Sequence, residues 1–232
     1  MSAVPLVLLP GLLCDEALWA PQVAALADVA DARVADLTRD DDIGAMAARV
    51  LAESPPRFAL AGLSMGGYVS FEVMRRAPGR VTHLALLDTS ARPDTPERAQ
   101  LRRDFIALAR SGGFRGLTPR LLPQWVHHSR MSDPRFVEAV TSMTLRVGRD
   151  AFIRQQTAIL GRPDSRPGLS RIRVPTLVLC GRQDQATPVE VAREIASDIE
   201  GARLVVVEEC GHLATLERPD EVSSAMRAWL AA

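Results

Sequence analysis

The stretch Gly62-Leu63-Ser64-Met65-Gly66-Gly67-Tyr68 places one serine among three glycines, between a short apolar run and a run with helical periodicity. Glycine has no Cβ, so it allows positive φ angles and close approach of neighbouring backbone. A junction this tight suits a strand-to-helix turn that holds the serine in a strained, exposed position. The pattern G-x-S-x-G is that of a nucleophile elbow, which presents a catalytic serine. The alternative is an ordinary turn that happens to contain a serine.

The composition indicates one globular domain with no general affinity for polyanions. The 232 residues are 47% hydrophobic and 24% charged, which is typical of a soluble globular protein. Every basic residue is an arginine, and the formal net charge is zero. A balanced charge gives no reason to expect nucleic acid or an anionic membrane as a partner.

The cysteines and the N-terminal segment bear on the cellular compartment. The three cysteines, Cys14, Cys180 and Cys210, are far apart and form no C-x-x-C pair, so we expect neither a disulfide framework nor a zinc site. The chain starts without a basic segment, and its first apolar run is too short for a signal peptide. No stretch approaches the roughly 20 apolar residues of a membrane span. These features predict a cytoplasmic protein.

Runs of strand length alternate with helical periodicity on both sides of a long interruption. We expect strands at 4–9, 32–37, 57–61, 81–87, 174–180 and 202–207. Strands that alternate with helices predict a mostly parallel sheet covered on both faces. The sequence Thr187-Pro188-Val189-Glu190 matches a capping box with proline at the first helical position, so a helix is expected to start there.

The interruption at 91–171 contains no convincing strand, and we expect it to be a helical insertion. Apolar residues at helical spacing mark two helices within it: Leu101, Phe105 and Leu108 in the first, and Phe136, Val140, Met143 and Val147 in the second. The core is therefore expected at 1–90 and 172–232, with 91–171 as a separate cap.

A serine hydroxyl is a poor nucleophile unless a base lies within hydrogen-bond reach. Among the four histidines, His212 comes just after the last expected strand. His83 lies inside a strand, where a structural role is expected, and His127 and His128 lie in the insertion, where a place on the cap surface is expected. His212 is therefore the candidate base.

The base in turn needs an acid that orients it, and two aspartates qualify. Asp184 follows the expected strand at 174–180, and Asp88 follows the strand at 81–87 as the alternative. Acyl transfer also needs backbone N–H donors for an oxyanion. Met65 starts a helix, where unpaired N–H groups and the positive dipole end coincide. Leu12, or its neighbour Leu13, follows the first strand and is the second candidate donor.

The four candidates Leu12, Ser64, Asp184 and His212 each follow a different expected strand. In an open parallel sheet, ligands bind beyond the carboxyl ends of the strands. Four independent placements at the same edge favour one catalytic site.

Five motifs in this order make the chain resemble the α/β-hydrolase family over nearly its whole length. They are LLPG at 8–11, GLSMGG at 62–67, APGRV at 77–81, GRQDQATP at 181–188 and CGHLATLERP at 210–219. The resemblance implies the α/β-hydrolase fold, with Ser64 as nucleophile, His212 as base and Asp184 as its partner. It also implies that 91–171 is a cap over the substrate pocket.

The chain departs from the family pattern at three places. Members usually begin with two more strands, so 32–37 is expected at a sheet edge, which suits its charged residues. Pro10-Gly11 stands where the family often has His-Gly. Leu63 stands where relatives often carry histidine or an aromatic residue. Leu63 would leave the wall of the substrate pocket apolar. Trp125 and Leu213 are further candidates for this wall, with apolar packing in the cap as the alternative for Trp125.

The resulting hypothesis is hydrolysis of a small or medium carboxylic ester through an acyl-enzyme, without a metal or cofactor. Fold does not fix function, so other reactions of the same triad stay open. These are hydrolysis of a thioester, a lactone or a C–C bond, and a lyase-type elimination. An arginine of the insertion that binds an acidic substrate would favour them over simple ester hydrolysis. A non-enzymatic receptor for a small molecule is a further alternative.

Overall fold

Six strands form a single sheet in the part of the chain that the structure, a computed structural model, describes, residues 3–118 and 120–232. The strands are β1 (Val4–Leu9), β2 (Ala30–Val34), β3 (Phe58–Leu63), β4 (Val81–Leu87), β5 (Thr176–Gly181) and β6 (Arg203–Val207). Their order is β2-β1-β3-β4-β5-β6, and every neighbouring pair is parallel. The predicted parallel sheet of about six strands is confirmed.

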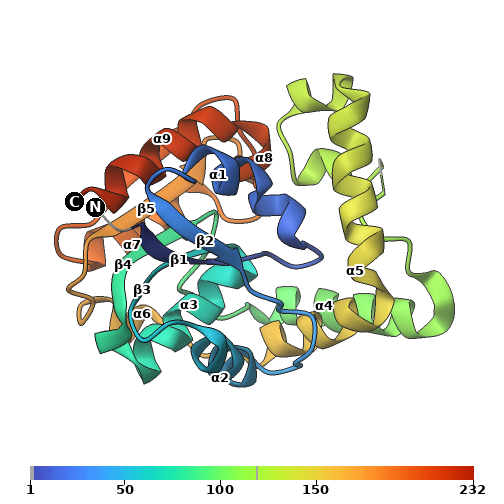
Figure 1. Cartoon of the computed structure of the whole chain (residues 1–232). Helices are drawn as coiled ribbons and strands as arrows, with labels where there is room; N and C mark the ends of the chain where they lie inside the picture. The colour runs from blue at the N-terminus through green and yellow to red at the C-terminus, as the bar shows by residue number, and fades with distance from the viewer. Residues whose placement is uncertain (1–2, 119) are drawn as a thin grey trace.

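Helices cover both faces of this sheet (Figure 1). They are α1 (Ala20–Ala25), α2 (Ile43–Glu53), α3 (Met65–Arg76), α4 (Pro96–Leu108), α5 (Pro134–Leu160), α6 (Arg166–Leu169), α7 (Val189–Asp198), α8 (Ala214–Glu217) and α9 (Pro219–Leu230). Helices α2, α3 and α7 pack on one face, and α1 and α9 pack on the other. None of the described helices is both long and apolar enough to span a lipid bilayer.

The alternation of side chains along β1 explains this two-sided core. Val7 and Leu9 belong to the cluster that includes α2, α3 and α7, whereas Leu6 and Leu8 belong to the cluster on the opposite face. Successive strand side chains point to opposite faces, so an unbroken apolar run needs cover on both. Each fully buried leucine stabilises the fold by about 1.5–3 kcal/mol.

Strand β2 lies at the sheet edge, as expected, but at 30–34 instead of 32–37. Its register with β1 pairs Val4 with Ala30 and Leu8 with Val34. The strand cannot extend to residue 37 because β1 ends at Leu9, which leaves no partner beyond that point.

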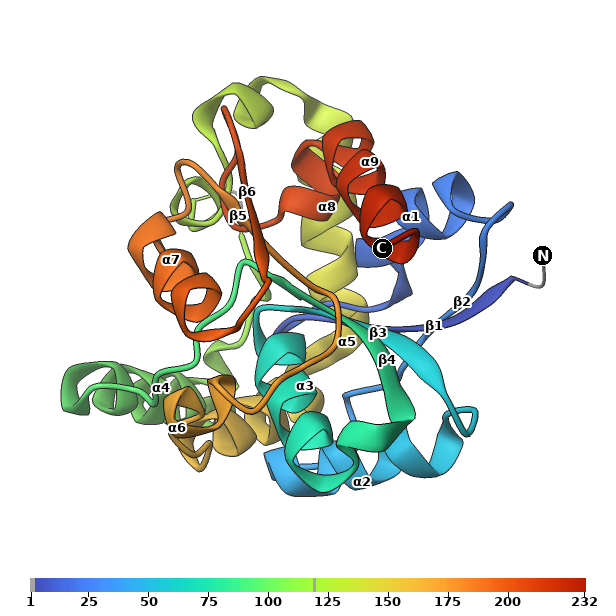
Figure 2. The ribbon, with the colours of Figure 1, turned by 90° about the vertical axis from the view of Figure 1, so that its left-hand side faces the viewer.

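Helices α4, α5 and α6 lie between β4 and β5, and no strand occurs in the described part of this segment. Helix α5 bends at Gly148, whose φ of 80° favours glycine. Helices α4 and α5 lie together at one end of the sheet, to its right in Figure 1, and α5 lies behind the strands in Figure 2. The boundaries at 91 and 171 stay a prediction.

Candidate active site

Ser64 occupies the one-residue junction between β3, which ends at Leu63, and α3, which begins at Met65. Its backbone has φ 55° and ψ −112°, a region that residues other than glycine rarely adopt. The Ser64 carbonyl accepts hydrogen bonds from the Thr89 hydroxyl at 2.7 Å and from the Gly67 N–H at 2.9 Å. These bonds hold the serine in its strained conformation.

The neighbouring glycines are required by close backbone approach. A Cβ on Gly66 would lie 2.1 Å from the Leu9 carbonyl oxygen, and one on Gly62 would lie 2.4 Å from the Gly66 carbonyl oxygen. Helix α3 therefore starts directly against β1 and β3, which is possible only without side chains there. The strand-to-helix junction thus brings Ser64 to the carboxyl edge of the sheet.

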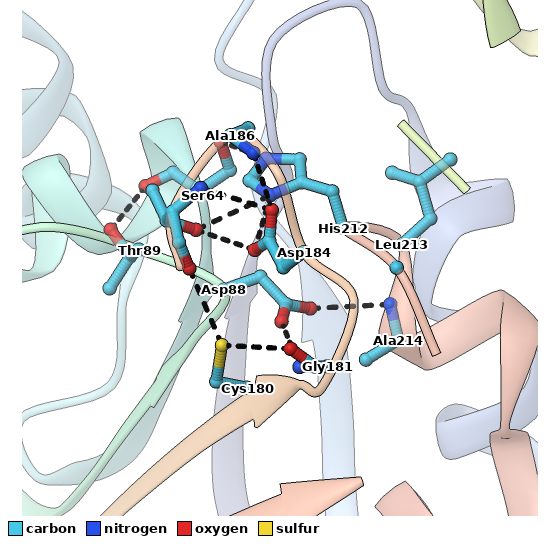
Figure 3. A network of polar contacts seen from close by, with 12 residues as sticks. Ser64, Asp88, Thr89, Cys180, Gly181, Asp184, Ala186, His212, Leu213 and Ala214 are labelled. Atoms are coloured by element: carbon cyan, nitrogen blue, oxygen red, sulfur yellow. Dashed lines mark hydrogen bonds and ion pairs between the residues drawn. The ribbon is translucent and has the colours of Figure 1, made fainter. Parts of the chain in front are cut away.

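Ser64, His212 and Asp184 form a continuous hydrogen-bonded chain (Figure 3). The distance from His212 Nε2 to Ser64 Oγ is 2.9 Å, and that from His212 Nδ1 to Asp184 Oδ2 is 2.8 Å. Because a carboxylate accepts, Nδ1 carries the proton in this arrangement and Nε2 is left to accept from the serine hydroxyl. The structure thus brings together the three side chains that the sequence nominated.

Asp184 is held as a carboxylate by its surroundings. Burial acts to raise the pKa of Asp184, but the attraction of His212 and hydrogen bonds from His212 and Thr187 outweigh it and lower this pKa. The N–H groups of Ala186 and Thr187 donate to Oδ1 at 2.8 and 3.0 Å. The carboxylate therefore has a fixed orientation toward the imidazole.

Thr187 does not cap a helix, so the predicted capping box is wrong. Its hydroxyl donates to Asp184 Oδ2 at 2.6 Å. Helix α7 begins at Val189, after Pro188, with no side-chain hydrogen bond at its N-terminal boundary. The buried carboxylate of Asp184 competes for the Thr187 side chain, and a charged partner makes the stronger hydrogen bond.

Asp88, the alternative acid, faces other groups. Its side chain accepts from the Gly181 N–H at 2.9 Å and from the Ala214 N–H at 3.2 Å (Figure 3). Within the described residues, no hydrogen bond joins it to His212. Burial and the nearby charge of Asp184 raise the pKa of Asp88 well above its ordinary value.

Asp88, Cys180 and Asp184 form a group whose potential metal-ligand atoms lie within 4.8 Å of one another. Both carboxylates already accept hydrogen bonds from backbone or side-chain donors. Burial raises the pKa of the Cys180 thiol, which disfavours the thiolate that a metal binds. This donor set suits a hydrogen-bonded network better than a metal centre.

The loop that carries His212 is anchored at every backbone N–H from 210 to 214. The N–H groups of Gly211 and Leu213 donate to the two carboxylate oxygens of Glu217, each at 3.0 Å. Those of Cys210, His212 and Ala214 donate to the Gln183 amide oxygen at 3.0 Å, the Trp125 carbonyl at 2.7 Å and Asp88 at 3.2 Å. An irregular loop usually leaves some of these donors to solvent. Here side chains and the insertion fix the position of the imidazole.

Glu217 makes two of these contacts and was assigned no role from the sequence. It also accepts from the His127 N–H at 2.7 Å, so one buried carboxylate joins the His212 loop to the insertion. Burial raises the pKa of Glu217, against the three N–H bonds, which act to lower it. The sequence shows only that Glu217 follows His212 by five residues. This spacing does not indicate that the carboxylate accepts three backbone N–H bonds.

We expect Glu217→Gln to lower kcat for ester hydrolysis about tenfold or more, because small displacements of a catalytic group are costly. The amide group would place N–H donors against a backbone N–H, at about 1–3 kcal/mol of stability. Glu209→Gln is the control, because Glu209 is exposed and pairs with Arg218. Steady-state kinetics and thermal melting would test this. A kcat equal to that of Glu209→Gln would refute a positioning role.

The two candidate oxyanion donors also lie beside Ser64. Within the described residues, the N–H groups of Leu12 and Met65 donate no hydrogen bond to the protein. The Leu13 N–H, by contrast, donates to Gln155 Oε1 at 3.0 Å. Leu12, and not Leu13, therefore has its N–H available.

Two cavities meet at Ser64. The apolar cavity, of about 60 Å³, is lined by Leu63, Trp125 and Leu213, the three residues that were expected at the pocket wall, together with other apolar side chains. The arginine-lined cavity, of about 310 Å³, lies between the site and α4. A substrate can therefore extend from Ser64 in two directions.

The other histidines lie outside this site. His83 packs its ring against Trp229, with ring centroids 5.9 Å apart, in keeping with a structural role. His127 is buried instead of lying on the cap surface, because its N–H bonds to Glu217 and its ring packs on His128.

Comparison with known proteins places this geometry in a family. A family model described as "Alpha/beta hydrolase family" matches residues 6–225. A pimeloyl-[acyl-carrier protein] methyl ester esterase of Aliivibrio salmonicida is 26% identical, over 97% of this chain and 91% of the relative. A solved thermophilic esterase from Thermogutta terrifontis is 30% identical, with a TM-score of 0.90 over 99% of this chain and 90% of that one.

An enol-lactonase from Burkholderia xenovorans is 28% identical to the chain, with a TM-score of 0.90 over 100% of this chain and 93% of that one. The family match spans nearly all of the sheet and both loops that carry His212 and Asp184. The protein therefore belongs to the α/β hydrolase family, among its carboxylesterase-like hydrolases.

Proposed function

We propose that the protein hydrolyses small or medium carboxylic esters by acyl transfer to Ser64. The observation that supports this best is the chain of hydrogen bonds Ser64–His212–Asp184, at 2.9 and 2.8 Å, where two cavities meet. A nucleophile, a base and an orienting acid in this order are what acyl transfer requires.

In the first step, the Ser64 oxygen bonds to the ester carbonyl carbon while His212 Nε2 takes the hydroxyl proton. The carbonyl oxygen becomes an oxyanion, which the Leu12 and Met65 N–H groups stabilise. The C–O bond to the alcohol then breaks, and His212 donates its proton to the leaving oxygen. The alcohol departs, and the acyl group stays on Ser64.

In the second step, water attacks the acyl-enzyme. His212 takes a proton from the water, the tetrahedral intermediate forms again, and the proton returns to the Ser64 oxygen as the acid is released. Asp184 keeps the Nδ1–H tautomer and stabilises the imidazolium in both steps. Each oxyanion donor lowers the barrier by about 2.7–4 kcal/mol.

The apolar cavity limits one end of the substrate. Its volume of about 60 Å³ is several times smaller than the roughly 310 Å³ of the arginine-lined cavity. A short apolar group therefore suits the apolar cavity better than a long chain does. The longer part of the substrate extends into the arginine-lined cavity.

We expect hydrolysis of p-nitrophenyl esters from acetate to decanoate, with the highest kcat/KM among the short and medium chains. A fluorophosphonate reagent, which couples covalently to activated serines, is expected to add to the peptide that contains Ser64, as mass spectrometry would detect. Turnover limited to thioesters or lactones would change the substrate class. Binding of small molecules without any turnover or labelling would favour the receptor alternative and refute the proposal.

A further inference from the structure

The arginine-lined cavity is bounded on one side by a single face of α4. Arg98, Leu101, Arg102 and Phe105 all line it. Their spacing of three, four and seven residues puts them on one side of the helix. Helix α4 thus presents two cations and two apolar side chains toward the space next to Ser64.

Arg102 belongs to a cluster with a net positive charge. Its guanidinium pairs with Asp94 at 2.5 Å and donates to the Gln156 amide oxygen at 2.7 Å. Asp94 also pairs with the buried Arg162 at 2.8 Å. One carboxylate is thereby shared between two guanidinium groups, which leaves one positive charge unbalanced beside the cavity.

Arg98 has no carboxylate partner within ion-pair distance among the described residues. Among the described residues, its guanidinium donates one hydrogen bond, to the Ala186 carbonyl at 2.8 Å. A guanidinium group has five N–H donors, so Arg98 retains most of them for a ligand.

The other described residues that line the arginine-lined cavity do not offset its positive charge. Its other polar side chains, apart from His212 and Ser64 of the site, are Tyr68, Gln124, Gln156, Gln185 and Thr187. No aspartate or glutamate lines it within residues 3–118 and 120–232. The apolar cavity, which also borders Ser64, has no arginine among the described residues of its wall.

From this asymmetry we propose that the substrate is an ester with an anionic group, such as a carboxylate, on its longer arm. The short apolar arm occupies the apolar cavity, and the anionic end lies against Arg98 and Arg102. This inference rests on the proposed ester hydrolysis. Contrary to the expectation from the sequence, an anionic arm does not decide which bond the triad cleaves, so these arginines are compatible with an ester. Charge-assisted hydrogen bonds are stronger than neutral ones. Arg98 is exposed and Arg102 is half-buried, so both can be reached by a ligand.

Two matched ester pairs test the inference. Monoethyl adipate and ethyl hexanoate differ by a carboxylate in place of a methyl group on the acyl side. The acetate ester of 6-hydroxyhexanoate and hexyl acetate differ in the same way on the alcohol side. In at least one pair we expect kcat/KM for the anionic ester to be about tenfold or more higher at low salt. Added NaCl should reduce this preference by screening.

Variants of α4 assign the preference to the cavity. Arg98→Gln is expected to reduce the ratio of anionic to neutral kcat/KM about tenfold, and Arg98→Lys to restore part of it. Arg103→Gln is the control, because Arg103 lies on the same helix but hydrogen-bonds to Gln100, away from the cavity. Its ratio should equal that of the wild type. A phosphate-bearing ester in the same assay would distinguish a carboxylate from a phosphate preference.

Equal kcat/KM values within both pairs would overturn the inference while ester hydrolysis itself stood. So would a preference that Arg98→Gln leaves intact. If neither the four esters nor any p-nitrophenyl ester is hydrolysed, both the proposed function and this inference fail.

Discussion

Ser64→Ala is expected to lower kcat/KM for ester hydrolysis by about 10⁴-fold or more, because removal of a triad nucleophile leaves only binding and oxyanion stabilisation. The substitution removes one oxygen, while the strained backbone stays fixed by Thr89 and Gly67. The fold should therefore persist. Hydrolysis of p-nitrophenyl acetate by both proteins, with circular dichroism as the check on folding, measures the effect.

Ser70→Ala is the matched control for this experiment. Ser70 lies on the same helix, is buried, and donates its hydroxyl to the Gly66 carbonyl at 2.8 Å. Its loss removes one local hydrogen bond, at about 1 kcal/mol, and should leave kcat/KM close to the wild-type value. Retention of more than a few per cent of activity by Ser64→Ala would remove Ser64 as nucleophile.

Asp184→Asn should reduce kcat by about 10⁴-fold, the effect of fixing the wrong imidazole tautomer in a triad. The N–H groups of Ala186 and Thr187 point at Oδ1, so the amide oxygen would take that position. The amide NH₂ would then face His212 Nδ1, which could only accept. The imidazole proton would move to Nε2, and the base could no longer accept the Ser64 proton. Single-turnover and steady-state assays would measure the loss.

Asp88→Asn distinguishes the two acids that the sequence left open. Asp88 accepts two backbone N–H bonds and, among the described residues, makes no hydrogen bond with His212. We therefore expect a lower melting temperature and a kcat within about tenfold of wild type. If Asp88→Asn proved the more damaging of the two in kcat while remaining folded, Asp184 would lose its assignment as the acid.

The fold could be predicted from the sequence because the signals for its strands and helices lie within short segments. Apolar runs such as 4–9 and 81–87 have the length of buried strands, and the alternation with helices determines a parallel sheet. The expected order of Ser64, Asp184 and His212 along the chain was also readable, because each follows a strand. The cytoplasmic location and the absence of nucleic-acid and membrane partners stay predictions.

The contacts that hold Asp184 and His212 in place could not be predicted from the sequence, because they depend on how segments meet in space. Thr187 matched a helix-capping pattern, and only its proximity to Asp184 in space shows what its hydroxyl does. Glu217 stabilises the His212 loop through N–H groups, which carry no sequence signature. Burial of a carboxylate among such donors depends on how α8 meets the insertion, which no single segment determines.

The insertion contributes two acceptors to the catalytic loops, and this affects how the enzyme could be re-engineered. The Trp125 carbonyl accepts the His212 N–H, and Gln155 of α5 bridges the Leu13 N–H and the Leu37 carbonyl. A chimaera that exchanges the segment between β4 and β5 for that of a relative to alter selectivity would discard both contacts along with the old pocket wall. Grafts should keep these two residues as fixed points, and proteolytic nicking of this segment should inactivate the site before the sheet unfolds.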